Sequence, residues 1–371
     1  MSSKVNKFAF YFPQFYCIPE NDKHWGLGFT DWDNVKSSIA LFDNHNQPRI
    51  PLDGYYDQSI PDTITKQVKL AKKYGLDGFS FYHYWFDGEL VLGTPVRNFL
   101  DNKSLDLKFS FTWANETWSR RWVGDDTTII FKQTHNKSKE IWKEHFNYLI
   151  EFWLDIRYEK IQGKPIFNIY NPHLIGDAEE MFEYWHSLAL EHGLPGIHFV
   201  AIVVSPTFNQ NLLNCYDGVL DFQPRYSTNQ ILVNKGLLHA FVDKLRFLPE
   251  PILNFLTKIR HKFSSIELIE YQSIWDNIID LKGNNNFDSN LKRYYGAFVD
   301  WDNTPRYKEK GKVYTGVSPS AFEGNMKALV DGLDENDYIF INAWNEWSEG
   351  AYLEPDMLNN YKYLEVIKGL S

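Results

Sequence analysis

Eight short apolar runs alternate along the chain with longer segments of helical periodicity, and this alternation constrains the fold more than any other feature. The runs are residues 7–12, 78–82, 108–113, 165–170, 198–204, 218–222, 294–299 and 338–342. The helices that we predict between and after them are 61–74, 139–159, 178–192, 320–333 and 360–368. Repeated βα units build parallel sheets, so eight of them predict an α/β protein with a (β/α)8 TIM barrel.

The domain organisation follows from this barrel, because one such unit commonly takes up roughly 250 residues or more. We therefore predict a single domain over residues 1–371. Two segments exceed a minimal barrel. The long loop 17–57 after the first strand predicts a lid or wall of the site, and residues 229–290 predict a helical insertion between strands six and seven.

The insertion contains a locally basic segment, 235–262, in which Lys and Arg outnumber the acids Asp243 and Glu250. Leu and Phe recur at helical spacing between residues 237 and 248, which predicts an amphipathic helix. One interpretation is a helix packed on the flank of the barrel with a solvated basic face. The other is peripheral contact with a membrane surface or a lipid-linked glycan.

The charge balance and the cysteine count exclude several classes of partner. A formal net charge of −10 disfavours a nucleic-acid partner, because phosphate backbones are bound through clustered Lys and Arg. The two cysteines, Cys17 and Cys215, are too far apart in sequence for a zinc motif and predict free thiols. The start shows no apolar leader, and no stretch approaches the about 18 apolar residues of a membrane span. We expect a cytoplasmic protein, an expectation that a removed leader would overturn.

Aromatic and polar side chains gather where the predicted strands end. The chain has 13 Trp, 22 Tyr and 28 Phe, and flat aromatic faces stack on sugar rings. Barrel active sites lie at the carboxyl ends of the strands. We therefore predict a glycan partner and the following substrate-binding residues: Tyr11, Gln14, Tyr82, His83, Tyr84, Trp85, Trp113, Asn115, Glu116, Trp118, Gln223, Arg225, Trp301, Trp344, Asn345 and Trp347.

Glu346 and Glu349 are the candidate catalytic pair, three positions apart after the eighth strand. In a helical turn this spacing sets both side chains on one side, about 5 to 6 Å apart at Cβ. Paired carboxylates with different protonation states cleave or transfer sugars. The alternative is a pair of acids that stabilise a helix start.

Other candidates carry weaker signals. Glu116 is a possible charge-setting or acid group that the neighbouring Arg120 and Arg121 would keep ionised. His83 is equally compatible with a buried core histidine. The tripeptides Asp31-Trp-Asp33 and Asp300-Trp-Asp302 match the loose pattern by which many nucleotide-sugar transferases hold a metal, but this pattern is common by chance. We predict no metal and no cofactor.

Several longer motifs are spread along the chain nearly from end to end. They are Tyr11-Phe-Pro-Gln14, Ile18-Pro-Glu-Asn-Asp22, Gly28-Phe-Thr-Asp-Trp32, Gln47-Pro-Arg-Ile-Pro-Leu52, Tyr82-His-Tyr-Trp-Phe86, Trp113-Ala-Asn-Glu-Thr-Trp118, Asn342-Ala-Trp-Asn-Glu-Trp-Ser-Glu-Gly350 and Leu353-Glu-Pro355. In these motifs the chain resembles the WbsX family of bacterial polysaccharide gene clusters, which is related to the family 99 endo-α-mannosidases. The resemblance implies a (β/α)8 barrel that acts on glycans.

The resemblance also implies a division of labour between the two glutamates. The catalytic Asn-Glu-Trp-x-Glu-Gly motif of family 99 falls on Glu346 and Glu349. In that mechanism the first glutamate deprotonates the 2-hydroxyl of the substrate, which attacks the anomeric carbon to form a 1,2-anhydro sugar. The second protonates the departing oxygen and then activates water. After strand three the endomannosidases have a His-Ile-Glu-Pro-Tyr type segment, whereas this chain has Trp-Ala-Asn-Glu-Thr-Trp at residues 113–118. This difference bears on specificity for mannose.

Three functions therefore stay open on the sequence. The first is a retaining glycoside hydrolase of a bacterial polysaccharide or oligosaccharide, which uses Glu346 as base and Glu349 as acid/base. The second is a glycosyltransferase in O-antigen, lipopolysaccharide or capsule biosynthesis. The third is a glycan-binding barrel without catalytic activity.

Overall fold

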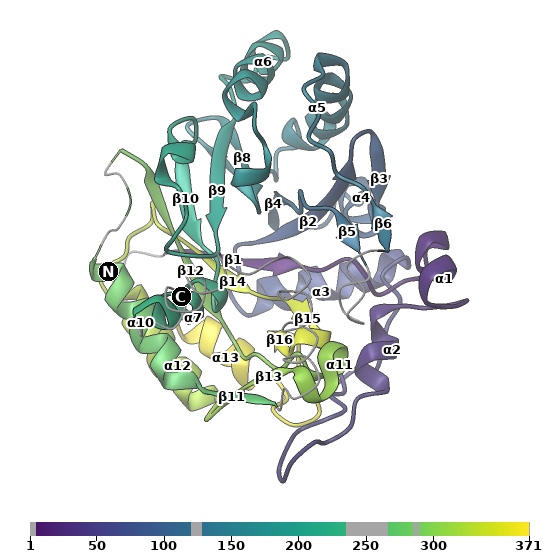
Figure 1. Ribbon diagram of the computed structural model, residues 1–371, viewed down its shortest axis with the longest axis vertical. Helices are drawn as coiled ribbons and strands as arrows, with labels where there is room; N and C mark the ends of the chain where they lie inside the picture. The colour runs from purple at the N-terminus through teal and green to yellow at the C-terminus, as the bar shows by residue number, and fades with distance from the viewer. Residues whose placement is uncertain (1–4, 120–127, 235–265, 285–286, 288–289, 371) are drawn as a thin grey trace, which may run out of the picture.

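The computed structural model describes residues 5–119, 128–234, 266–284, 287 and 290–370. Its central parallel strands are β1 Asn6–Tyr11, β2 Gly78–Phe86, β4 Lys108–Trp113, β8 Lys164–Ile169, β9 His198–Val203, β10 Gly218–Asp221, β12 Lys292–Phe298 and β14 Tyr338–Asn342. They pair in this order and the barrel closes, because β1 pairs with both β2 and β14 (Figure 1). Each strand corresponds to one predicted run, so the (β/α)8 barrel is confirmed.

Side chains on the barrel strands alternate between the barrel interior and the helix layer, as the pleat requires. On β1, Phe8 and Phe10 belong to the interior cluster, whereas Ala9 and Tyr11 pack in the core between strands and helices. This two-residue period decides which side chains near a strand end can reach a site inside the barrel mouth.

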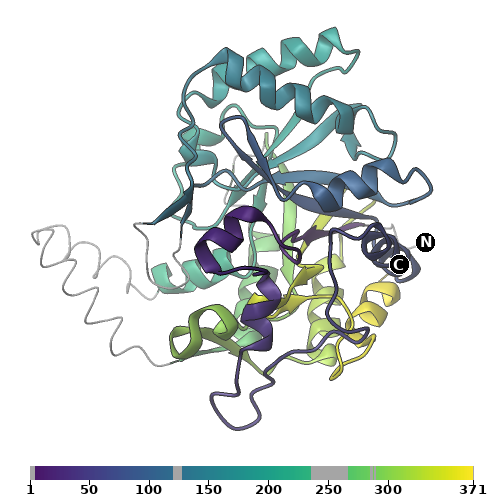
Figure 2. The ribbon, with the colours of Figure 1, turned by 90° about the vertical axis from the view of Figure 1, so that its right-hand side faces the viewer.

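The helices surround the barrel (Figures 1 and 2). They are α3 Pro61–Lys73, α4 Thr94–Asp101, α5 Lys139–Trp153, α6 Ala178–Glu191, α7 Arg225–Asn234, α10 Tyr271–Gly283, α12 Pro319–Val330 and α13 Lys362–Gly369. The five predicted helices correspond to α3, α5, α6, α12 and α13. Ser138 and Ser318 cap α5 and α12 by accepting hydrogen bonds from backbone N–H groups in the first turn, which explains where these helices begin.

The predicted insertion lies only partly in the described residues. Its end forms β11 Glu267–Glu270 and α10, and α10 buries Trp275 and Ile278 in the main core. This helix occupies the helix layer between β10 and β12, so it belongs to the barrel itself and is not an addition to it. The basic segment 235–262 and its predicted amphipathic helix lie outside the described residues.

Shorter elements shape the carboxyl end of the barrel and its connections. They are α1 Pro19–Trp25, α2 Asp31–Lys36, β3 Glu89–Val91, β5 Trp118–Ser119, β6 Ile129–Phe131, β7 Lys160–Ile161, η2 Pro172–Leu174, η3 Gln210–Leu213, α11 Thr304–Tyr307, η4 Lys308–Lys310, β13 Lys312–Thr315, β15 Asn345–Glu346, η5 Trp347–Glu349 and β16 Ala351–Tyr352. Among the described residues, no helix is both long and apolar enough to cross a membrane.

The long loop 17–57 packs beside the segment that follows β14. Its helix α2 contacts η5 and α11, and a capping box at Thr30 fixes the start of α2. Trp32 of α2 stacks on Phe15 with ring centroids 4.0 Å apart and also packs against Trp347. The loop therefore forms a wall next to the carboxyl end of the barrel.

Candidate active site

A cavity of about 550 Å³ opens at the carboxyl ends of the barrel strands. The predicted residues that line it are Gln14, Tyr82, Tyr84, Glu116, Trp118, Arg225, Trp301, Glu346 and Glu349. Lining residues that are absent from the predicted substrate-binding set include Phe12, Tyr170, Phe222, Asn303, Arg306, Tyr307, Lys310, Lys312, Tyr314 and Asn342. Aromatic faces and charged groups thus share one cavity, which is the composition of a carbohydrate site.

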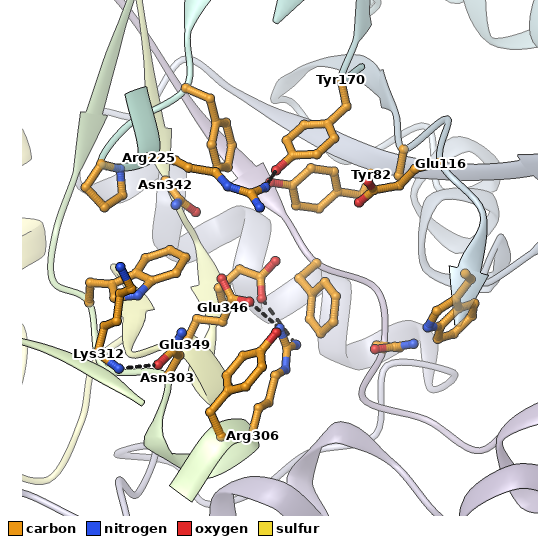
Figure 3. A pocket seen from close by; sticks show the side chains of 18 of the residues that line it. Tyr82, Glu116, Tyr170, Arg225, Asn303, Arg306, Lys312, Asn342, Glu346 and Glu349 are labelled. Atoms are coloured by element: carbon orange, nitrogen blue, oxygen red, sulfur yellow. Dashed lines mark hydrogen bonds and ion pairs between the residues drawn. The ribbon is translucent and has the colours of Figure 1, made fainter. Parts of the chain in front are cut away.

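The two glutamates meet at one guanidinium (Figure 3). Glu346 ends β15, and Glu349 ends the helical turn η5 that follows directly. Arg306 Nη1 lies 2.5 Å from Glu349 Oε1, and Arg306 Nη2 lies 3.6 Å from Glu346 Oε2. Both carboxylates therefore contact one guanidinium, although only Glu349 lies in the helical turn and Glu346 precedes it.

Arg306 is a functional candidate that the sequence analysis missed. It is buried in α11, and its Nη2 also pairs with Asp31 Oδ2 at 2.9 Å. Asp31 in turn accepts a hydrogen bond from the hydroxyl of Ser348, which lies in η5 between the two glutamates. The available signal was the position of Arg306 shortly after strand seven, but a contact with Asp31 across 275 residues leaves no local trace.

Glu346 has the electrostatic surroundings of a catalytic acid or base. Burial raises its pKa well above the ordinary value, and the charges of Glu349 and Asp31 raise it further, while Arg306 lowers it. Its Oε2 atom is buried and accepts no hydrogen bond from the described residues. The Arg306 contact at 3.6 Å is too long to be one. Glu346 keeps an exposed fraction of 7% and lines the cavity, so its carboxylate can accept a hydrogen bond from a bound hydroxyl.

A second buried carboxylate, Glu354, binds side chains of the segment that carries Glu346 and Glu349. Its two oxygens accept hydrogen bonds from Gln67 Nε2 at 2.6 Å, Trp344 Nε1 at 3.0 Å, Tyr56 Oη at 2.6 Å and Trp347 Nε1 at 2.7 Å. Burial raises the pKa of Glu354 to about 7, although these hydrogen bonds oppose the rise. Trp344 and Trp347 flank Glu346 in sequence, so their indoles anchor the turn.

Trp344 and Trp347 do not line the cavity, and neither do the predicted amides Asn345, Asn115 and Gln223. Asn345 bonds both the N–H and the C=O of Phe12, and Asn115 bonds the backbone of Asn171. Gln223 is buried, and its side-chain oxygen accepts from the N–H of Ser227. These amides fix the strand ends. Their positions, and those of Trp344 and Trp347, do not support the prediction that they touch substrate.

The pleat explains four more displaced predictions. Tyr11, His83, Trp85 and Trp113 all lie at positions that alternate away from the barrel interior, and all four are buried beside the helix layer. The Tyr11 hydroxyl donates to Gln67, and His83 Nε2 lies 2.8 Å from His145 Nε2. Burial lowers the pKa of His83 to about 3, so this ring is neutral, as for a core histidine. None of the four lines the cavity.

Two predicted charged groups face each other across the cavity mouth. Glu116 Oε2 accepts a hydrogen bond from Asn171 Nδ2 at 3.0 Å, and Arg225 Nη1 donates to the Tyr170 hydroxyl at 2.8 Å. Arg120 and Arg121, which the sequence suggested as partners of Glu116, lie outside the described residues.

The candidate metal tripeptides are engaged in ion pairs and hydrogen bonds. Asp300 pairs with Arg49 at 2.7 Å, and Asp302 binds His45, Gln47 and Arg49 from the long loop. In the part of the chain that the structure describes, no group of three or more His, Cys, Asp or Glu side chains is arranged to hold a metal.

Comparisons with known proteins identify the family of the chain and its fold. The family model described as "Glycosyltransferase WbsX" matches residues 7–367. Two curated relatives from strains of Xanthomonas campestris pv. campestris, both described as "Uncharacterized protein WxcX", are 30% identical over 366 residues. The match covers 97% of this chain and 48% of each relative, so the chain spans about half their length.

Solved structures with the same fold are glycoside hydrolases by description. The GH99 endo-alpha-mannosidase from Bacteroides thetaiotaomicron superposes with a TM-score of 0.59 at 14% identity, covering 98% of this chain and 96% of the enzyme. A "Glycoside hydrolase-like protein" gives a TM-score of 0.59 at 14% identity, covering 99% and 94% of the two chains. Likeness at this identity establishes the shared barrel.

Proposed function

This chain belongs to the WbsX family, and we propose that it is a retaining glycoside hydrolase of a bacterial surface polysaccharide or oligosaccharide. Family membership and the shared barrel support an enzyme that acts on glycans. The observation that carries the finer proposal is the placement of Glu346 and Glu349 around one buried arginine in an aromatic cavity.

The proposed reaction uses the 2-hydroxyl of the substrate as its nucleophile. This hydroxyl donates to the Glu346 carboxylate, which takes its proton while the hydroxyl oxygen attacks the anomeric carbon and displaces the glycosidic oxygen. Glu349 gives its proton to that departing oxygen. Glu349 then takes a proton from water, which opens the 1,2-anhydro ring, and Glu346 returns its proton to the 2-oxygen. Two inversions at the anomeric carbon retain its configuration.

The raised pKa of Glu346 suits this base role. A general base is most effective when its pKa lies near the working pH, because it is then both ionised and basic enough. Burial supplies the rise, and Arg306 keeps the ionised form accessible. Tyr82, Tyr84 and Trp301 line the same cavity and offer faces for the sugar ring.

The first test replaces each glutamate by its neutral isostere. We expect Glu346→Gln and Glu349→Gln each to lower glycan hydrolysis by about 10² to 10⁴-fold, the usual contribution of one acid–base group. Release of reducing ends from bacterial surface polysaccharides and from a panel of aryl glycosides measures this. Glu323→Gln on the exposed face of α12 is the matched control. Undiminished hydrolysis in either active-site variant would refute the assignment.

The second test addresses the nucleophile. Substrates with 2-deoxy or 2-O-methyl groups should not react, because they lack the oxygen nucleophile or its proton. Proton NMR of the first product formed should show the anomeric configuration of the substrate. Normal turnover of the 2-deoxy glycoside would rule out the neighbouring-group route and leave the glutamates a different mechanism.

Glycosyl transfer is the second candidate, and the description of the family favours it. A nucleotide-sugar transferase would show nucleotide-diphosphate binding that depends on Asp31, Asp33, Asp300 or Asp302. Such binding would require Asp300 and Asp302 to exchange Arg49 for a metal. Glycan binding without turnover over days would instead identify a non-catalytic barrel.

A further inference from the structure

We propose that the glycan bound in this cavity carries an anionic group, a carboxylate or a phosphate, and that Arg225 binds it. The inference rests on the proposed function in one respect, namely that the cavity takes a glycan. It goes further by naming the chemical class of that glycan. The site is the wall formed by the start of α7 and the segment from α11 to β13.

Arg225 is presented to the cavity with most of its donors available. Its side chain is exposed, lines the cavity and lies next to Tyr170 and Asn342 (Figure 3). A guanidinium has five N–H donors. The described residues provide one hydrogen-bond partner, the Tyr170 hydroxyl at 2.8 Å. Burial raises the pKa of Tyr170, so this partner is a neutral phenol.

Arg306, in the same cavity, is an arginine that the protein itself pairs with carboxylates. It is buried, and its two terminal nitrogens contact the carboxylates of Asp31, Glu346 and Glu349. Within the described chain, by contrast, no carboxylate oxygen lies within 4.0 Å of the Arg225 guanidinium. The two arginines therefore differ in role: one is neutralised by the protein, and the other is open to a ligand.

The neighbouring cations extend the same wall. Lys310 and Lys312 also line the cavity, and a hydrogen bond of 2.5 Å between Thr228 and Tyr314 joins α7 to β13. Lys312 pairs with Glu267 at 2.9 Å, whereas Lys310 is exposed and has no ion pair in the described part of the chain. Arg225 and Lys310 thus leave this wall with unneutralised positive charge.

The cavity carboxylates Glu116 and Glu349 attract the charge of Arg225, but no described carboxylate forms an ion pair with it. Glu346 and Glu349 are engaged by Arg306, and Glu116 accepts its hydrogen bond from Asn171. An arginine in a recessed site binds an oxyanion through short, charge-assisted, often paired hydrogen bonds. A neutral sugar hydroxyl needs no full charge. The polarised cavity therefore favours an acidic glycan, oriented with its anionic group on the α7 side.

The test measures binding of free sugars that have no glycosidic bond and so cannot be hydrolysed. The probes are glucuronic acid, glucose 6-phosphate and glucose, with inorganic phosphate as a fourth, and ligand-observed NMR measures their affinities for the full chain. We expect wild type to bind at least one anionic probe about tenfold more tightly than glucose, with an affinity that falls as salt is added. Preference for glucuronic acid identifies a carboxylate ligand, and preference for the two phosphates identifies a phosphate ligand.

Variants tie this preference to the residue. Arg225→Gln should lose the preference for anionic probes, so that its affinities for charged and neutral probes differ by less than about twofold. Arg225→Lys should keep part of the preference. Arg97→Gln, which removes an exposed arginine paired with Glu151 on the helix layer, should bind like wild type. Circular dichroism and thermal unfolding check that the Arg225 variants are folded.

Two results would overturn the proposal. One is equal binding of charged and neutral probes by wild type, and the other is an unchanged preference in folded Arg225→Gln. Both are independent of catalysis. Preference for the anionic probes without cleavage of any glycan would refute the hydrolase and leave the anionic-glycan proposal standing. Efficient cleavage of neutral glycans without any anion preference would refute the anionic-glycan proposal and leave the hydrolase standing.

Discussion

Burial and three neighbouring charges together set the protonation of Glu346. Burial and the charges of Glu349 and Asp31 favour the neutral form, and Arg306 favours the carboxylate. The base role requires the carboxylate form. The rate should therefore depend on how well Arg306 offsets burial and the two negative charges. This balance can be tested by removing the arginine charge alone.

For wild type we expect kcat/KM to fall in acid below a pKa that lies above the ordinary value of 4.5 for a glutamate. In Arg306→Gln this acid limb should move to higher pH by about one unit or more, because the positive charge that favours the carboxylate is lost. Arg306→Lys should move it less. Rates between pH 4 and 9 measure the effect, with Arg97→Gln as control. An acid limb that stays in place would contradict the base role of Glu346.

Glu354 provides a second prediction at this scale, for stability. Its pKa of about 7 in the folded protein exceeds the ordinary 4.5, so the folded state holds a proton that the unfolded chain releases. Stability from this group is therefore present below pH 4.5 and is lost as pH rises toward 7. Relative to Glu354→Gln, wild type should lose about 3 kcal/mol of unfolding free energy across this interval. Urea unfolding of both proteins at four pH values measures this loss. A difference in unfolding free energy that stays constant with pH would contradict the raised pKa of Glu354.

At the scale of elements, the turn β15–η5–β16 is clamped from two directions. The N–H of Asp302 donates to the Glu349 carbonyl at 2.7 Å, and Arg49 Nη1 donates to the Gly350 carbonyl at 3.2 Å. Gly350 has φ of 68°, and a Cβ there would lie 2.7 Å from the Asp302 nitrogen. The turn can thus approach the β12 end only because residue 350 has no side chain.

Gly350→Ala should therefore damage both stability and catalysis. The left-handed conformation and the backbone clash together should cost about 2 kcal/mol or more, and kcat should fall because Glu349 precedes the strained residue. Gly324→Ala is the matched control, since Gly324 lies in α12 with open space around it. That change should stabilise the protein by about 0.5 to 1 kcal/mol. Equal unfolding free energies for the two variants would contradict the clamp.

At the scale of the whole molecule, the barrel was predictable because hydrophobic alternation is written locally in each strand. The same alternation also distinguishes Tyr82 and Tyr84, which line the cavity, from His83 and Trp85, which face the helices. Applied strictly along each strand, this rule would have removed Tyr11, His83, Trp85 and Trp113 from the predicted set. The pairing of Arg306 with Asp31 could not be predicted, because it depends on how a loop after β1 and a turn after β12 meet in space.

A second long-range contact, made by buried Asp302, joins the long loop 17–57 to the end of β12. Leu41 N–H donates to His45 Nδ1, so the proton on Nε2 is directed at Asp302 Oδ2, 2.9 Å away. Burial opposes ionisation of Asp302, but these hydrogen bonds and the Arg49 charge hold its pKa well below the ordinary 3.8. The carboxylate thus ties an early loop to a late strand and supports the turn that carries Glu349.

Asp302→Asn should loosen this connection without unfolding the barrel. At neutral pH we expect a loss of about 3 kcal/mol, typical of breaking a buried ion pair. Because the folded pKa is depressed, the stabilisation exists above pH 3.8 and is lost as pH falls further, so the gap between wild type and variant should narrow in acid. Hydrogen exchange should rise in residues 41–57 and stay unchanged in β4 and β8. Asp106→Asn, at an exposed ion pair with Lys72, should change neither property. A gap that widens in acid, or exchange that rises evenly over the barrel strands, would show that Asp302 does not hold the loop through its charge.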